Sequence, residues 1–200
     1  MIFSLQQFLF LIITYLICSI PFGLLISKFF IKKDIRNYGS GNIGATNVTR
    51  VAGKMPGLLT LILDGAKGAV MIIFARFIFN DVNNYNSFLA VVGAVAVIGH
   101  VFPVYIKFKG GKGVATTIAV LLAINPIVGL INAAVWLVIF IITRISALAS
   151  LVSIITATAF VSYYHTAKAE IILCFFLTVL ILMRHKDNIY RLLSGKENKF

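Results

Sequence analysis

The chain has 200 residues, of which 60% are hydrophobic and only 12% are charged. Soluble domains carry roughly 45–50% apolar and about 25% charged residues, so this composition excludes an ordinary soluble protein. At this length it also leaves no room for a separate soluble domain. The formal net charge of +12 makes the placement of the cations informative. We expect residues 1–200 to form a single membrane-embedded domain, an all-α helical bundle.

Apolar runs long enough to enter or cross a bilayer recur along the chain, since one crossing needs about 20 residues. These runs are 4–30, 57–79, 87–106, 113–143, 146–164 and 169–183. The first run has no Lys or Arg ahead of it and no small-residue cleavage pattern. It is therefore predicted to be an uncleaved first span and not a signal peptide.

The run 113–143 is too long for one crossing. As a single helix it would extend about 46 Å, whereas the hydrocarbon core is about 30 Å thick. Asn125-Pro126 divides the run near its middle, and the residue before a proline is pushed out of the α region. The run is predicted to be either two short passes or a re-entrant pair.

The distribution of basic residues indicates whether this run makes one pass or two. Lys and Arg collect on the cytoplasmic side of bacterial membrane spans. Here they gather after the first run, before the fourth run and in the C-terminal tail. Two passes bring all three clusters to one side. We therefore predict about seven passes, with 113–124 short or re-entrant, the N-terminus outside and the C-terminus in the cytoplasm.

Residues 38–50, YGSGNIGATNVTR, are the first of three polar stretches on the predicted cytoplasmic side. The glycines permit close backbone approach and positive φ. Ser40 or Asn42 is expected to cap a helix that runs toward Arg50. Because free N–H groups at a helix start attract phosphate, the stretch predicts an anion site, with a capped connector as the alternative.

Residues 99–117, GHVFPVYIKFKGGKGVATT, are the second stretch. Gly110 and Gly111 are predicted to present consecutive N–H groups as an anion-binding nest, with Lys109 and Lys112 as point charges. The helix that follows would face the same anion with the positive end of its dipole. The glycine spacing does not match the G-x-x-x-x-G-K-[ST] loop, so we exclude a nucleotide hydrolase. A positively charged membrane anchor is the alternative.

The third stretch is the tail, RHKDNIYRLLSGKENKF, at 184–200. On one helix, Arg184, Asn188 and Arg191 recur at i, i+4 and i+7, and His185 neighbours Asn188. This spacing predicts a common face of guanidinium, amide and imidazole groups, although a simple anchor for the last span is the alternative. Together the three stretches predict a strongly anionic, phosphate-bearing ligand that arrives from the cytoplasm, with apolar spans beside it for a lipid chain.

These stretches resemble the three signature motifs of the bacterial acyl-phosphate:glycerol-3-phosphate acyltransferase family (PlsY). The matching segments, in the family's order, are SGNIGATNVTR (40–50), GHVFPVYIKFKGGKGVAT (99–116) and RHKDNIYRLLSGKE (184–197). The resemblance implies an enzyme of the bacterial inner membrane that transfers a fatty acyl group from acyl phosphate to the 1-hydroxyl of glycerol 3-phosphate. The products would be lysophosphatidic acid and phosphate, at an early step of phospholipid biosynthesis.

The resemblance also implies which residues act and what they need. No metal, organic cofactor or nucleic acid is expected; the partners are the two substrates and membrane lipid. The oligomeric state is left open, a monomer being one option, and so is the acyl-chain preference. The expected catalytic residues are Ser40, Lys112, His185 and Asn188. The residues expected to bind the substrate phosphates are Ser40, Gly41, Asn42, Thr46, Asn47, Arg50, Lys109, Gly110, Gly111, Lys112 and Arg191.

The chemistry of an acyl phosphate agrees with these residue types. The substrate is a mixed anhydride and already activated, so the protein's task is to position two phosphates and stabilise charge. The proton acceptor is either His185 or a substrate phosphate. The phosphate is favoured, because no carboxylate in the motifs is obviously placed to orient the imidazole, although Asp187 and Glu197 lie close in sequence.

Three further points leave alternatives open. A membrane transporter of an anionic phosphate ester is the main alternative function, but a carrier is expected to show repeated halves and polar residues near mid-membrane. Asp64 and Lys67 are i, i+3 partners inside a predicted span, so they predict either an internal ion pair or an edge of the substrate site. His100 is expected to position the second stretch, with a catalytic role as the alternative.

Overall fold

The computed structural model describes residues 3–164 and 166–200, which form ten α-helices and two 3-10 turns without any strand. The helices are α1 (Leu5–Cys18), α2 (Phe22–Ile31), α3 (Ala45–Ala52), α4 (Lys54–Ile78), α5 (Tyr85–Val101), α6 (Val114–Ile124), α7 (Pro126–Thr143), α8 (Ser146–Tyr163), α9 (Lys168–Arg184) and α10 (Lys186–Leu193). The predicted all-α fold is confirmed.

Within the described residues, five segments are long and apolar enough to cross a membrane: Leu5–Ile31, Lys54–Ile78, Tyr85–Ile106, Pro126–Thr143 and Ser146–Tyr163. The apolar helices α9, with 17 residues, and α6, with 11, are shorter. Many large hydrophobic side chains on these helices are exposed, as on the lipid-facing surface of a membrane bundle. The protein is therefore a multi-pass membrane protein.

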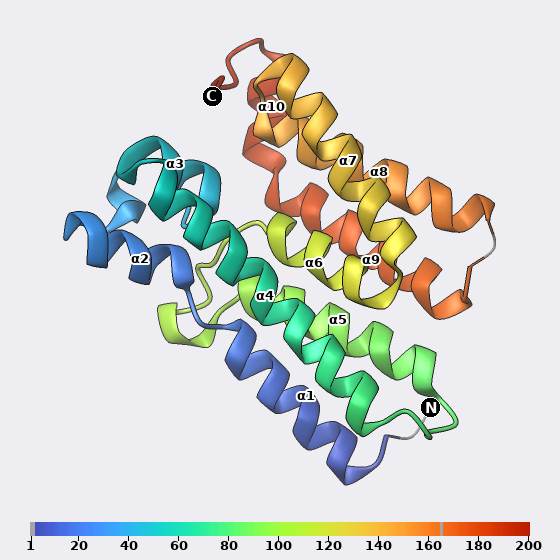
Figure 1. The fold of residues 1–200 in the computed structure, drawn as a ribbon. Helices are drawn as coiled ribbons and strands as arrows, with labels where there is room; N and C mark the ends of the chain where they lie inside the picture. The colour runs from blue at the N-terminus through green and yellow to red at the C-terminus, as the bar shows by residue number, and fades with distance from the viewer. Residues whose placement is uncertain (1–2, 165) are drawn as a thin grey trace.

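The bundle has two distinct ends (Figure 1). The start of α1 and the α4–α5 connection lie at one end, whereas α3, α10 and the C-terminus lie at the opposite end. The main hydrophobic core runs between them and includes Phe88, Ile72, Ile154 and Leu177, all of which are almost fully buried. A smaller cluster of buried side chains packs beneath α2 and α3 and supports the loop between them.

The first predicted span, 4–30, is not one continuous helix. α1 ends at Cys18 and α2 begins at Phe22, after Pro21, which has no N–H to continue the helical hydrogen bonding. The carbonyl of Ile20 in this break accepts a hydrogen bond from Lys67 Nζ at 2.8 Å. The break inside the apolar run is thus satisfied by a lysine of α4.

The run 113–143 is divided where the sequence predicts. Asn125 is extended (φ −141°) between α6 and α7, and its side chain accepts a hydrogen bond from Val128 N. α6 packs along α4: Thr116 Oγ1 donates to the carbonyl of Asp64 at 2.9 Å, and Arg76 Nη2 donates to the carbonyl of Ile124 at 2.6 Å. α6 therefore begins opposite the middle of α4 and ends opposite its last turn.

Candidate active site

A cavity of about 780 Å³ opens among α3, α4, α6, α7, α8 and α10, and we call it the central cavity. Part of its wall is apolar, formed by Leu58, Leu61, Ile118, Leu122 and Leu137. The remainder is polar. The predicted site residues that line the cavity are Ser40, Asn42, Thr46, Asn47, Arg50, Lys112, His185, Asn188 and Arg191. Segments far apart in the sequence thus meet at one place.

The other predicted phosphate-binding residues, Gly41, Lys109, Gly110 and Gly111, are not among the described residues that line the cavity. Lys109 is exposed on the loop before α6. Gly41 lies at a turn with φ +70°, where its N–H donates to the carbonyl of Tyr38. These residues shape or flank the loops and do not form the cavity wall.

Asn47 organises the loop that precedes α3. Its side chain is buried; Oδ1 accepts a hydrogen bond from Ser40 N at 2.9 Å, and Nδ2 donates to the carbonyls of Tyr38 at 3.1 Å and Asn42 at 2.8 Å. Both ends of the amide are therefore engaged with the backbone. Asn47 holds Ser40 and Asn42 in place at the cavity wall.

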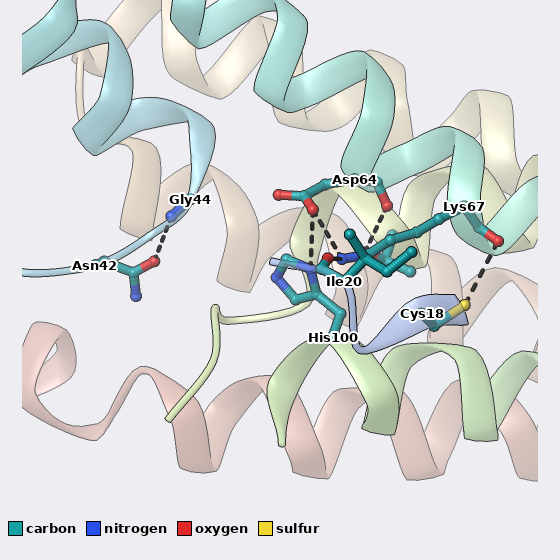
Figure 2. A network of polar contacts seen from close by, with 8 residues as sticks. Cys18, Ile20, Asn42, Gly44, Asp64, Lys67 and His100 are labelled. Atoms are coloured by element: carbon teal, nitrogen blue, oxygen red, sulfur yellow. Dashed lines mark hydrogen bonds and ion pairs between the residues drawn. The ribbon is translucent and has the colours of Figure 1, made fainter. Parts of the chain in front are cut away.

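The predicted cap of α3 is wrong. The N-cap residue is Gly44, which has no side chain to bond the first N–H groups, and neither Ser40 nor Asn42 takes that role. Asn42 instead closes the turn before the helix, because its Oδ1 accepts a hydrogen bond from Gly44 N at 2.8 Å (Figure 2). The first N–H groups of α3 are left without a side-chain cap beside the cavity.

The predicted nest at Gly110 and Gly111 is also wrong. Gly110 N donates to the carbonyl of Val101, and Gly111 N donates to the carbonyl of His100, each at 3.2 Å. Both N–H groups are therefore already bonded. A Cβ atom on Gly111 would lie 2.1 Å from His100 Nε2, so the glycines here let the loop approach His100 closely.

Lys112 joins the second stretch to the third. Its Nζ donates a hydrogen bond to Asn188 Oδ1 at the cavity wall. Burial lowers the pKa of the Lys112 ammonium from its ordinary value to about 8, although Glu197 acts in the opposite direction. An anion bound in the cavity would favour the charged form. Gly113, with φ +86°, makes the left-handed turn that brings the following helix start to the cavity.

The predicted common face of the tail does not form, because the helix breaks at His185, between α9 and α10. Arg184 points elsewhere: its Nη2 donates to the carbonyl of Gly110 at 3.3 Å, and its guanidinium lies 5.7 Å from the centre of the Phe102 ring. Arg184 therefore supports the loop of the second stretch. His185, Asn188 and Arg191 remain together at the cavity.

His185 is oriented by a backbone carbonyl and not by a carboxylate. Its Nδ1 lies 2.9 Å from the carbonyl oxygen of Ile181. Because a carbonyl only accepts hydrogen bonds, Nδ1 carries the proton, and Nε2 is left as an acceptor. Burial, followed by the charge of Lys112, lowers the pKa of His185 to about 4. The imidazole is therefore neutral at physiological pH.

Sequence reasoning missed the part played by Glu197 and by two serines of α8. Glu197 accepts hydrogen bonds from Asn188 Nδ2 at 2.7 Å and Arg191 Nε at 2.8 Å, so it fixes both side chains. Ser146 and Ser150 line the cavity, and Ser146 Oγ lies 3.1 Å from Thr46 Oγ1. Their i, i+4 spacing within an apolar run was the available signal.

Asp64 and Lys67 form the internal ion pair that is one of the two alternatives their spacing predicts. Lys67 Nζ bonds Asp64 Oδ1 at 2.8 Å, and each side chain is only 3% exposed, so they form an internal ion pair. His100 Nδ1 lies 3.5 Å from the same oxygen (Figure 2). Asp64 and His100 both line the central cavity, which places the pair at its edge.

The fold and the cavity define a class: a helical, multi-pass membrane protein with cationic and hydroxyl side chains facing an apolar-walled cavity. The family model described as glycerol-3-phosphate acyltransferase matches residues 8–195. A glycerol-3-phosphate acyltransferase of Bartonella henselae is 41% identical over 198 residues, which is 99% of this chain and 93% of the relative. One of Neisseria meningitidis serogroup A is 41% identical over 187 residues, 94% of each chain.

Solved structures agree. The chain is similar to the crystal structure of PlsY, an integral membrane glycerol 3-phosphate acyltransferase, in its glycerol 3-phosphate form, with a TM-score of 0.90 and 40% identity over 98% of this chain and 96% of that one. The lysophosphatidic acid form gives a TM-score of 0.88 and 39% identity, over 98% and 95% of the two chains. The chain belongs to the glycerol-3-phosphate acyltransferase family, as the three motifs predict.

Proposed function

We propose that this protein transfers a fatty acyl group from acyl phosphate to the 1-hydroxyl of glycerol 3-phosphate, releasing lysophosphatidic acid and phosphate. Family membership supports the acceptor substrate and the acyl transfer. The observation that carries the proposal is the meeting of all three stretches at one cavity, where Lys112 of the second bonds Asn188 of the third. The apolar wall beside them suits an acyl chain.

The cavity offers what two phosphate-bearing substrates need. Arg50, Lys112 and Arg191 supply positive charge, so they offset the repulsion between the phosphates. Ser40 and Thr46 add hydroxyl donors without further charge. Asn188 is held by Lys112 on one side and Glu197 on the other, which preorganises its amide beside the reacting groups.

The reaction needs no acyl-enzyme intermediate. The 1-hydroxyl oxygen attacks the acyl carbonyl carbon, the bond from that carbon to the phosphate oxygen breaks, and phosphate leaves. His185, with a pKa of about 4, is a weaker base than a phosphate dianion, whose conjugate acid has a pKa of about 6. We therefore assign the hydroxyl proton to a substrate phosphate, and the neutral His185 is not its acceptor.

We also propose that residues 1–200 form one domain with seven passes in the bacterial inner membrane, and that a monomer suffices for the site. Support for the seventh pass comes from α6: its end is bonded by Arg76 in the last turn of α4, and Asn125 Nδ2 bonds Glu170 Oε2 in the first turn of α9 at 2.9 Å. α6 thus reaches the end of the bundle opposite α10. The cavity would face the cytoplasm, together with the C-terminus.

Reporter fusions test this topology. A reporter after Phe200 and tags near residues 35 and 110 should all report the cytoplasm, whereas a tag near residue 83 should report the outside. A C-terminal reporter outside, together with residue 110 inside, would contradict two passes through 113–143.

An activity assay tests the function. The purified protein in detergent, given acyl phosphate and glycerol 3-phosphate, should release phosphate and form lysophosphatidic acid. An acyl coenzyme A thioester should not replace acyl phosphate, and equal rates with both donors would remove the assignment of the donor. A transporter would give no product in detergent, because it needs two compartments.

A further inference from the structure

Asp64 is a carboxylate on the wall of a cavity whose other features suit anions. It lies in the middle of α4, and its side chain is 3% exposed. A carboxylate repels phosphate, so phosphate binding gives no reason for its presence there. Ionised side chains inside a membrane are costly and are usually functional. The contacts of Asp64 indicate which ligand group it binds.

One carboxylate oxygen of Asp64 is fully engaged. Oδ1 accepts a hydrogen bond from Lys67 Nζ at 2.8 Å and lies 3.5 Å from His100 Nδ1. Lys67 is held in turn by the carbonyl of Ile20 at 2.8 Å. The Lys67 ammonium therefore neutralises the Asp64 carboxylate and fixes its orientation. Within the described part of the chain, Lys67 is not among the residues that line the cavity, so we assign it no phosphate-binding role.

The second oxygen, Oδ2, points away from Lys67 and His100, to the side on which Asn42 and Gly44 lie (Figure 2). Asn42, Gly44, Asp64 and His100 all line the central cavity. The Oδ1 atom of Asn42 is already bonded to Gly44 N. A ligand between Asn42 and Gly44 on one side and Asp64 on the other would therefore find Asp64 Oδ2 available as a hydrogen-bond acceptor.

An ionised oxygen on a side chain that is only 3% exposed is stabilised by a hydrogen-bond donor. The phosphate oxygens of both substrates are acceptors when ionised, and they repel the carboxylate. Among the groups of the two substrates, only the two hydroxyls of glycerol 3-phosphate can donate. The 1-hydroxyl must face the acyl carbonyl that it attacks, so the 2-hydroxyl remains for Asp64.

We propose that Asp64 Oδ2 accepts a hydrogen bond from the 2-hydroxyl of glycerol 3-phosphate, and that this contact selects glycerol phosphate over phosphates of simple diols. Lys67 is a positioning residue for Asp64. The proposal rests on the proposed acyltransferase activity, which supplies the substrate.

The experiment compares kcat/KM for glycerol 3-phosphate and for 3-hydroxypropyl phosphate, which lacks the 2-hydroxyl, with acyl phosphate as donor. The purified wild-type protein should prefer glycerol 3-phosphate by about ten- to a hundredfold, the range for a hydrogen bond to a charged group. Equal rates with the two acceptors would overturn the proposal before any variant is made. No turnover of glycerol 3-phosphate at all would instead contradict the proposed function.

The variant Asp64→Ala/Lys67→Met removes both charges together, because removing one partner leaves the other charge buried and unpaired. It should lose most of the preference, by slowing glycerol 3-phosphate turnover while leaving the analogue nearly unchanged. Asp64→Asn/Lys67→Met, which keeps the Asp64 side-chain shape and leaves no unpaired charge, should retain part of the preference and serves if the first double variant does not fold. The matched control, Thr116→Val, removes a bond to the Asp64 carbonyl only and should affect both acceptors equally. Equal losses with both acceptors in the Asp64 variants would contradict the proposal.

Discussion

The loops at 38–44 and 107–113 are both rich in glycine, yet the glycines act in different ways. In the first loop, Gly39 and Gly41 have φ of +59° and +70°, so they permit a backbone conformation that other residues rarely adopt. In the second, Gly110 and Gly111 have no positive φ, and they provide space beside His100. The pair Gly110 and Gly111 therefore has a steric cause, whereas Gly113 at the end of the second loop shares the conformational cause of Gly39 and Gly41.

The loops also differ in what they bring to the cavity. The first is held by the buried amide of Asn47 and presents uncharged groups of Ser40 and Asn42. The second presents one ammonium, that of Lys112. Substitution of Lys112 should therefore act through lost charge, and substitutions in the first loop should act through lost loop shape.

Loss of the Lys112 charge should have the largest effect. Lys112→Ala removes an electrostatic contact to the reacting phosphates, and we expect a loss of about 10²–10³ in the rate of phosphate release. Lys112→Arg should also be poor, because a planar guanidinium does not replace a compact ammonium in a tight turn. Lys199→Ala, an exposed tail residue, is the control and should stay near wild type. Equal activity of Lys112→Ala and Lys199→Ala would make the second loop a mere membrane anchor.

Gly111→Val tests the steric role of the second loop. The added side chain would meet His100 Nε2 and displace the neighbouring Lys112, and a shift of about 1 Å costs roughly a hundredfold in rate. The variant should remain folded, as judged by its elution and thermal unfolding in detergent. Wild-type phosphate release by a folded Gly111→Val protein would show that close approach to His100 is not needed.

Asn47→Ala tests the first loop. It removes the bonds to Ser40 N and to the carbonyls of Tyr38 and Asn42, which should lower the free energy of unfolding by about 1–3 kcal/mol and raise KM for glycerol 3-phosphate. Thermal unfolding and initial rates measure the two effects.

Alanine substitutions at Gly39 and Gly195 distinguish two costs in stability: the strain of a left-handed backbone and the clash of a new side chain with the loop. Gly39→Ala combines φ +59° with a contact of 2.2 Å to Asn47 Oδ1, whereas Gly195→Ala has φ +67° in open space. Gly195→Ala should therefore cost only the strain of the left-handed conformation, about 1–2 kcal/mol. A smaller loss of stability for Gly39→Ala than for Gly195→Ala would contradict the packing of Asn47 against the loop.

The pH dependence of kcat/KM is the smallest effect that we expect from the second loop. Lys112, with a pKa of about 8, is charged below that pH and neutral above it, so kcat/KM should fall about tenfold per pH unit above pH 8. The residual activity of Lys112→Arg should lack this limb, because a guanidinium stays charged. Initial rates between pH 6 and 10 measure it; an unchanged limb in Lys112→Arg would assign the titration to another group.

The features that the sequence predicted are those with local causes. The apolar runs indicate membrane helices, and Asn125-Pro126 divides α6 from α7 because proline restricts its neighbour. The three motifs predict the family, and most of the predicted site residues meet at one cavity. The acyl-phosphate donor, the catalytic roles and the orientation in the membrane stay predictions.

The features that the sequence could not predict depend on how the chain folds back on itself after a helix ends. The N–H groups of Gly110 and Gly111 are taken by carbonyls of the preceding helix end, which no pattern of glycines reveals. The break at His185 has neither proline nor glycine as a signal, and it separates Arg184 from the groups at i+4 and i+7. Glu197 reaches Asn188 and Arg191 only because the tail folds back.

The bonds at the two ends of α6 bear on how this helix is placed in the membrane. With 11 residues, this helix extends only about 16 Å and is too short to partition into the bilayer by its own hydrophobicity. Its partners, Asp64 and Arg76, belong to α4, which leaves the ribosome earlier. The depth of α6 in the bundle is therefore fixed by a helix that precedes it in the chain, and not by its own length.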